Sequence, residues 1–105
     1  MRADVELLSL VDVPRHRQGE RFLKGPIPWA WLARAMALPG KAVHVGIAVW
    51  MAAGIARNGL IAVNLSRLPI GRSAASRGLA ALERAGLVSV QRTAGRKPLV
   101  TVLEP

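Results

Sequence analysis

The hydrophobic residues of this 105-residue chain fall into blocks that are separated by segments containing Pro, Gly and charged residues. The first block, residues 28–40 (PWAWLARAMALPG), starts with Pro and ends with Pro-Gly, which is a favourable arrangement for a helix. Its apolar residues Trp29, Leu32, Ala33 and Met36 recur at i, i+3, i+4 and i+7. This spacing predicts a helix whose buried face consists of these four side chains. We expect the tryptophans of this helix to anchor a core or a subunit interface rather than to stack on bases.

Residues 41–57 predict the longest helix, which is apolar nearly all round. A helix of this kind must be covered on more than one face, here by the preceding tryptophan helix or by a partner subunit. His44 has no second His or carboxylate at metal-ligand spacing, so we expect a packed side chain rather than a metal ligand or a catalyst. The apolar run would rise only about 23 Å as a helix, against about 30 Å for a hydrocarbon core, so no membrane span is expected.

Shorter elements follow the long helix. Asn58-Gly59 is expected to end it, and residues 60–63 (LIAV) form a short run of strand type. Residues 65–68 leave room for about one helical turn before a proline. Residues 71–86 predict a second amphipathic helix. Residues 88–103 predict a β-hairpin, because two β-branched runs flank a turn that contains Gly, Lys and Pro.

The pattern therefore divides the chain into an N-terminal arm or linker, residues 1–27, and one domain, residues 28–105. Within the arm, residues 14–26 (PRHRQGERFLKGP) are bounded by prolines and contain a basic cluster. That cluster either contacts phosphates or belongs to a solvated linker; its members are Arg15, His16, Arg17, Arg21 and Lys24.

The helix predicted over residues 71–86 has two chemically different sides. Ala75, Gly78, Leu79 and Leu82 recur at helical spacing and predict the buried side, which Leu87 extends. The opposite side carries hydroxyl and guanidinium groups, on Arg72, Ser73, Ser76, Arg77 and Arg84. Small side chains let a helix enter the major groove, about 12 Å wide, and Arg can bind guanine or phosphate in a bidentate way. The helix N-terminus itself favours a phosphate.

The charge of the chain strengthens this interpretation. The formal net charge is +9, and residues 57–105 contain eight basic residues against two acidic ones. Such an excess attracts polyanions, with nucleic acid ahead of an anionic membrane surface. The chain has no Cys, which excludes a disulfide framework and thiolate chemistry and fits a reducing compartment.

The stretch IGRSAASRGLAALERAGLVSV resembles the recognition helix and first wing strand of winged helix-turn-helix regulators of the MarR and GntR type. The hairpin after it resembles the wing, and the resemblance covers about residues 42–103. It implies an α+β winged helix-turn-helix fold with an extra N-terminal helix. One departure is the helix before the recognition helix, which has two to three turns in those families and about one here. The implied DNA-binding residues are Arg72, Ser73, Ser76, Arg77, Arg92, Arg96 and Lys97.

The residue types do not favour catalysis. Pro39-Gly40-Lys41-Ala42 lacks the upstream Gly and the following Ser or Thr of a phosphate-binding loop. No Ser stands in a G-x-S-x-G elbow, and the acids and histidines form no pair with catalytic spacing. We expect a protein that is not an enzyme and that has no cofactor and no metal site.

The sequence thus predicts a small bacterial transcriptional regulator that binds double-stranded DNA as a homodimer, in the cytoplasm with the nucleoid. Two alternatives stay open. One is an architectural, excisionase-like DNA-binding factor of a phage or mobile element. The other is a protein-interaction adaptor that uses its three tryptophans at the interface.

Overall fold

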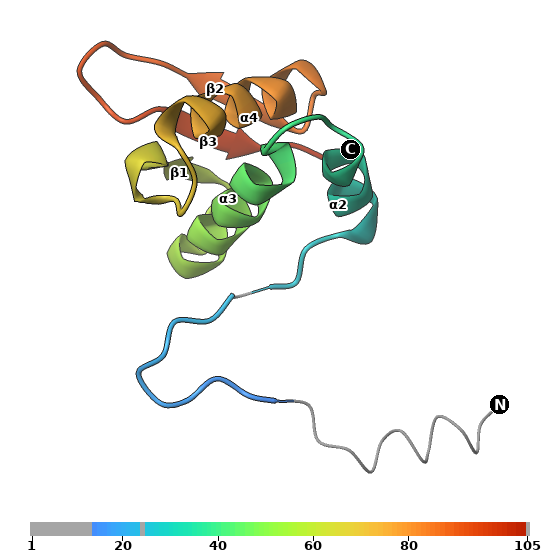
Figure 1. The fold of residues 1–105 in the computed structure, drawn as a ribbon, viewed down its shortest axis with the longest axis vertical. Helices are drawn as coiled ribbons and strands as arrows, with labels where there is room; N and C mark the ends of the chain where they lie inside the picture. Colours follow the sequence, from blue (N-terminus) through green and yellow to red (C-terminus); the bar gives the residue numbers. More distant parts are fainter. Residues whose placement is uncertain (1–13, 24, 105) are drawn as a thin grey trace, which may run out of the picture.

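The computed structural model describes residues 14–23 and 25–104 and shows an α+β arrangement (Figure 1). Within these residues, three α-helices and one 3-10 helix pack with a three-stranded antiparallel sheet. Residues 14–23 and 25–28 form neither helix nor strand, as predicted for the arm. The remainder of the predicted arm, residues 1–13 and Lys24, lies outside the described residues.

Helix α2, Trp29–Met36, forms where the first block predicts it but buries a different face. Trp29 and Met36 are 70% and 57% exposed, whereas Trp31 and Ala35 are fully buried. The predicted apolar face was therefore wrong. The indole of Trp31 decides the orientation, because it lies against Gly46 and its Nε1 donates to the carbonyl of Leu87 at 3.1 Å. A buried tryptophan requires both a flat cavity and an acceptor, and only this position of α2 finds both.

Helix α3, Ala42–Ala56, is the apolar helix of the centre. Its neighbours cover the side formed by Ala42, Val45, Gly46, Val49 and Ala53. Ile47 and Ile55 remain 37% and 65% exposed on its other sides.

One prediction for this helix was wrong: His44 is exposed rather than packed, because it is not among the residues on the covered side of α3. The predicted bounds, residues 41–57, agree with the N-cap Lys41 and the C-cap Arg57, which adopts the left-handed conformation with φ 54° directly before Asn58-Gly59. The N–H of Asn58 donates to the carbonyl of Ala53 at 3.2 Å and closes the last turn.

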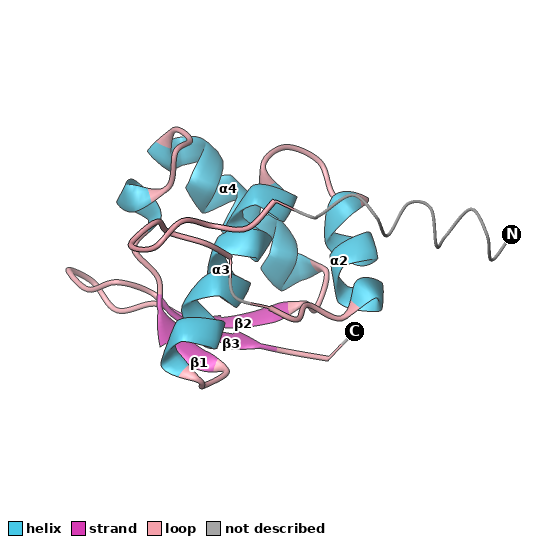
Figure 2. Cartoon of the chain, turned by 90° about the horizontal axis from the view of Figure 1, so that it is seen from below, coloured by secondary structure: helices cyan, strands magenta, loops and turns pink. Residues whose placement is uncertain are grey.

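The sheet has the strand order β1-β3-β2, so the last strand along the chain is the central one. Strand β1, Leu60–Ala62, and strand β2, Val88–Gln91, each pair antiparallel with β3, Leu99–Val102. Val100 of β3 is opposite Ile61 on one side and Val90 on the other. The three strands form one layer beneath α3 and α4 (Figure 2). The predicted strand and hairpin are thus confirmed.

Between β1 and α4 the chain forms a single 3-10 turn, η1, Leu65–Arg67, as its length predicted. Asn64 caps this turn, since its Oδ1 accepts hydrogen bonds from the amide and the hydroxyl of Ser66 at 3.2 and 2.6 Å. Leu65 and Leu68 pack against the core from this segment.

Helix α4, Arg72–Arg84, buries the predicted stripe of Ala75, Gly78, Leu79 and Leu82. Its closest approach to α3 is at Gly78, where a Cβ would lie 2.9 Å from the backbone oxygen of Lys41 and from Val45 Cγ2. Two helices come this near only where one of them lacks a side chain.

A Schellman motif ends α4. The N–H of Gly86, at φ 76°, donates to the carbonyl of Glu83, and the N–H of Leu87 donates to that of Leu82, both at 3.0 Å. Leu82 and Leu87 are both fully buried, which is the apolar contact that accompanies this motif. The turn thereby fixes the point at which strand β2 leaves the helix.

No helix of residues 14–23 and 25–104 is long and apolar enough to cross a membrane. The longest, α3, has 15 residues.

Candidate nucleic-acid interface

The outer side of α4 is the first part of the candidate interface. Ser73, Ser76 and Arg77 are exposed, and so is Arg72 in the first turn. They are exposed because the opposite side of the same helix, which contains Ala75, Leu79 and Leu82, is buried in the hydrophobic core. All four predicted residues of this helix therefore lie on accessible surface and within six residues of its start. Because the Ser side chains are small, a binding partner can approach the backbone of this helix closely.

The N-terminal end of α4 adds positive electrostatic potential. Gly71 occupies the N-cap with no side-chain acceptor, and the first turn contains no acidic residue. The first main-chain bond of the helix runs from the N–H of Ala75 to the carbonyl of Gly71 at 2.9 Å. The preceding N–H groups of the first turn thus have no helical partner, which is the usual arrangement at an anion-binding helix N-terminus. Arg72 places a full charge at the same end.

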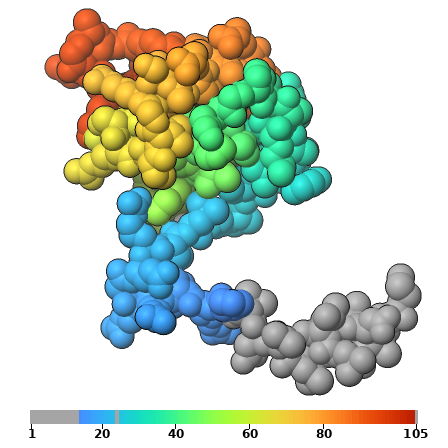
Figure 3. All heavy atoms as spheres, in the orientation of Figure 1, coloured from blue at the N-terminus to red at the C-terminus, as the bar shows by residue number. Residues whose placement is uncertain are grey.

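The hairpin of β2 and β3 forms the second part. Its connecting loop, residues 92–98, projects beyond the sheet (Figure 1). The N–H of Arg96 donates to the carbonyl of Thr93 at 3.1 Å, and Gly95 has φ 75°, so the tip is a tight turn. Arg96 and Lys97 are both exposed there. In the space-filling view this loop and α4 occupy the end of the molecule opposite residues 14–23 (Figure 3).

Arg92 lies at the base of this loop rather than at its tip. Its Nη1 is 3.0 Å from Oε1 of Glu83 on α4, in a half-exposed ion pair. The pair joins the hairpin to the last turn of the helix. It also neutralises Glu83, the one carboxylate among residues 65–98. Of the predicted site residues, Arg92 is therefore the one that already has an anionic partner.

Arg67 belongs to the same region, although the sequence did not single it out. It is the last residue of η1, directly before the segment that leads into α4, and its side chain is exposed. Residues 65–98 thus contain one carboxylate and seven basic side chains, of Arg67, Arg72, Arg77, Arg84, Arg92, Arg96 and Lys97. The short LSRL segment could have indicated this residue from the sequence, because a single turn there places the guanidinium of Arg67 close to the start of α4.

Most basic residues of the arm lie apart from the hairpin loop, but Arg21 lines one hollow together with Arg67. Arg15, Arg17 and Arg21 are exposed on the segment before α2, and His16 stacks on Phe22 with ring centroids 3.8 Å apart. The arm lies at the other end of the described structure from the hairpin loop (Figure 3).

In the described part of the chain, no three His, Cys, Asp or Glu side chains lie together in a group that could hold a metal ion. Comparisons with protein-family models, with curated proteins and with solved structures give no match. The function is therefore inferred from the geometry and charge of the surface itself.

Proposed function

We propose that this protein binds double-stranded DNA through a winged helix-turn-helix surface and acts as a small transcriptional regulator. The observation that carries the proposal is the juxtaposition on one end of the molecule of the Ser- and Arg-bearing side of α4 and a basic hairpin loop. The order helix, strand, single turn, helix and hairpin is compatible with a winged helix. In this proposal α4 enters the major groove, and the loop of the hairpin contacts the backbone or the minor groove.

The residue types support different roles for α4 and for the hairpin loop in DNA binding. Ser73, Ser76 and Arg77 lie on the first two turns of α4, the part of a recognition helix that reaches base edges. Arg96 and Lys97 lie in the loop of the hairpin. Long cationic side chains at such a position contact phosphates but not base edges, so they bind DNA without sequence specificity. The absence of an unpaired carboxylate from residues 65–98 removes the main source of repulsion from DNA.

The test is the affinity of the protein for duplex DNA as a function of salt. Selection from random duplexes first identifies the best site. If Arg72, Arg77, Arg96 and Lys97 each neutralise one phosphate, log K falls against log salt with a slope of about −3.6 per subunit. Participation of Arg67 makes the slope about one unit steeper. A slope near zero would show that these charges do not face DNA.

The alternative of an architectural, excisionase-like factor rests on the same surface and is separated from a simple repressor by DNA bending. The adaptor alternative predicted all three tryptophans at the interface, but Trp31 is fully buried, whereas Trp29 is exposed. An adaptor predicts no salt-dependent duplex binding, so the titration above distinguishes it.

A further inference from the structure

Helix α2 reaches the C-terminal end of α4 with two side chains. Nη2 of Arg34 donates to the carbonyl of Ala85 at 2.7 Å, and Nε1 of Trp31 donates to the carbonyl of Leu87 at 3.1 Å. Ala85 is the C-cap of α4, and Leu87 directly precedes β2. Two donors of one short helix therefore hold the segment in which α4 ends, although 51 and 56 residues separate each donor from its acceptor along the chain.

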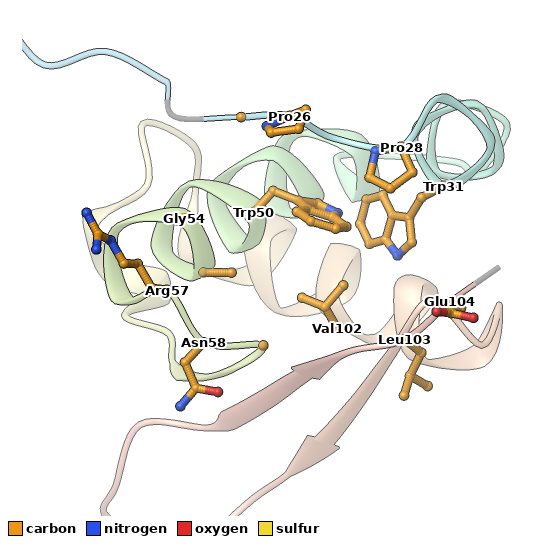
Figure 4. Close-up of a pocket in the computed structure, with 13 residues that line it drawn as sticks. Pro26, Pro28, Trp31, Trp50, Gly54, Arg57, Asn58, Val102, Leu103 and Glu104 are labelled. Carbon is orange, nitrogen blue, oxygen red and sulfur yellow. The ribbon is translucent and has the colours of Figure 1, made fainter.

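Helix α2 is itself fixed to α3 by the same tryptophan. Trp31 is fully buried, and a Cβ at Gly46 of α3 would lie 3.0 Å from its ring. The Trp31 ring also meets Trp50 of α3 edge to face, with centroids 5.6 Å apart. Figure 4 shows the two rings together beside a hollow that Val102 of β3 also lines. Because α2 is packed on α3 in this way, its contacts with Ala85 and Leu87 fix the end of α4 relative to α3.

The contact between α3 and α4 lies at the centre of α4. Gly78, where the two helices approach most closely, has residues 72–77 before it and residues 79–84 after it. At 1.5 Å per residue, about 9 Å of helix extends on either side. A tilt about Gly78 that moves the C-terminal end by about 1 Å therefore moves the N-terminal end by about as much in the opposite direction.

Apolar packing alone does not set this tilt. Leu79 and Leu82 keep α4 on the core, but the hydrophobic effect is not directional. A hydrogen bond does have a preferred distance and angle. The bond from Arg34 is also strengthened by charge, since its guanidinium donates to the C-terminal end of a helix, where the dipole favours a cation.

We propose that Arg34 is a positioning residue, which fixes the tilt of α4 through the carbonyl of Ala85 and so aligns Ser73, Ser76 and Arg77 for contact with base edges. The consequence for DNA rests on the proposed function. Contacts to base edges require the contacting side chains to be held within about 0.5 Å, whereas long side chains that bind phosphates carry no sequence information. Arg34 thus acts on sequence discrimination through α4 and not through a phosphate.

The first measurement is the angle between α3 and α4 in the full-length protein without DNA, from residual dipolar couplings of backbone N–H groups. Arg34→Met keeps an apolar stem but removes the donor. We expect the angle to change by about 6°, which corresponds to about 1 Å at the end of a 9 Å arm. Arg34→Lys keeps a cationic donor and should retain the wild-type angle. An unchanged angle in Arg34→Met overturns the proposal, even if the midpoint of denaturant unfolding shifts.

The matched control is Arg57→Met, which removes the same charge from an exposed residue outside α2 and α4, the C-cap of α3. It should leave the angle between α3 and α4 at its wild-type value. A similar change of angle in Arg57→Met and Arg34→Met shows that the tilt responds to overall charge, which contradicts a specific role of Arg34.

The second measurement compares affinities for the best duplex site and for random duplex DNA. Arg34→Met should lower the ratio of these affinities about three- to tenfold, less than the loss of a whole bidentate base contact would at its upper limit. The salt slope should stay unchanged, because Arg34 neutralises no phosphate. Arg34→Lys and Arg57→Met should keep the wild-type ratio. A slope that flattens by about one unit at a constant ratio would instead make Arg34 a phosphate contact.

The two measurements separate the failure of this inference from the failure of the proposed function. If the wild type binds no duplex DNA, the proposed function is wrong, while the angle measured without DNA still decides whether Arg34 positions α4. If the wild type binds DNA and Arg34→Met changes the angle but not the affinity ratio, the tilt of α4 does not serve discrimination between sequences, and the inference is wrong.

Discussion

At the scale of single residues, Gly78 sets the distance between the two central helices. Its absent Cβ would meet the backbone oxygen of Lys41 at 2.9 Å, and a backbone atom cannot move aside cheaply. Gly78→Ala should therefore destabilise the protein by about 1–3 kcal/mol, although Ala is the better helix former. Denaturant unfolding measures this.

The matched control is Gly59→Ala, because a Cβ at Gly59 meets nothing within 4 Å. We expect this change to be neutral or slightly stabilising. If both changes have the same effect on the free energy of unfolding, the approach of α3 and α4 is less tight than described.

Trp31 provides a second prediction at this scale. Trp31→Phe shortens a fully buried ring and removes one of the two donors to the carbonyl of Leu87, which still accepts from the N–H of Leu103. The expected loss is about 1–3 kcal/mol of unfolding free energy, from the lost hydrogen bond and the space left in the core. Trp29→Phe, at a residue that is 70% exposed, should change stability by less than about 0.5 kcal/mol. A similar loss in both variants would mean that the indole N–H of Trp31 contributes nothing.

At the scale of elements, α4 and the hairpin differ in how far each determines binding specificity. Arg96→Ala combined with Lys97→Ala should weaken binding to specific and random duplexes by similar factors. The same change should flatten the salt slope by up to about two units. Arg77→Ala should cost about 1–3 kcal/mol on the best site and much less on random DNA, because a bidentate contact to guanine is lost. Competition between the two duplexes measures both effects. Equal losses for Arg77→Ala on both would reassign it as a phosphate contact.

The ion pair between Glu83 and Arg92 joins these two elements. Glu83→Gln removes a carboxylate near the DNA surface and releases Arg92, so duplex affinity at low salt should rise several-fold and the slope should steepen by up to about one unit. Because the pair is half exposed, the free energy of unfolding should change by less than about 1 kcal/mol. Unchanged affinity would place this edge of α4 away from the DNA.

The elements differ in how well the sequence predicts them, for physical reasons. The buried stripe of α4 was predictable because its outer side is polar, so the contrast along the helix identifies the core side. Helix α2 offered two apolar sides. Its periodicity favoured Trp29 and Met36, whereas the acceptor for Trp31 comes from Leu87, 56 residues away. The exposure of His44 on an all-apolar helix likewise depends on which neighbours cover that helix.

The residues of the candidate site also differ in how well the sequence predicts them. Ser73, Ser76 and Arg77 follow from the helical pattern alone, and the structure places them on one accessible side. The partner of Arg92 depends on the hairpin folding back over the end of α4, a long-range arrangement that no local pattern encodes. The hollow lined by Trp31, Trp50 and Val102 depends on the packing of α2, α3 and β3 together, so no local sequence pattern predicts it.

At the scale of the whole molecule, apolar side chains remain uncovered on the N-terminal half. Trp29, Met36 and Ile55 are each more than half exposed. We expect a homodimer whose interface uses this half, and an operator that is an inverted repeat with half-sites about 10 bp apart or a multiple of that. Sedimentation at tens of micromolar tests the assembly. A monomer both free and on DNA would contradict it.

The position of β3 at the centre of the sheet also bears on how the chain is made. Leu60 of β1 pairs with Thr101, 41 residues later, and among the strands of residues 14–23 and 25–104 only β3 borders β1. At about 5–20 residues per second, a ribosome needs about 2–8 s to add that stretch. During this time β1 has been synthesised, but the strand with which it forms hydrogen bonds has not. The β2–β3 hairpin closes over a shorter loop, so its edge forms first and β1 joins last. In a nascent chain stalled before residue 99, neither β1 nor β2 would therefore have the strand with which it pairs.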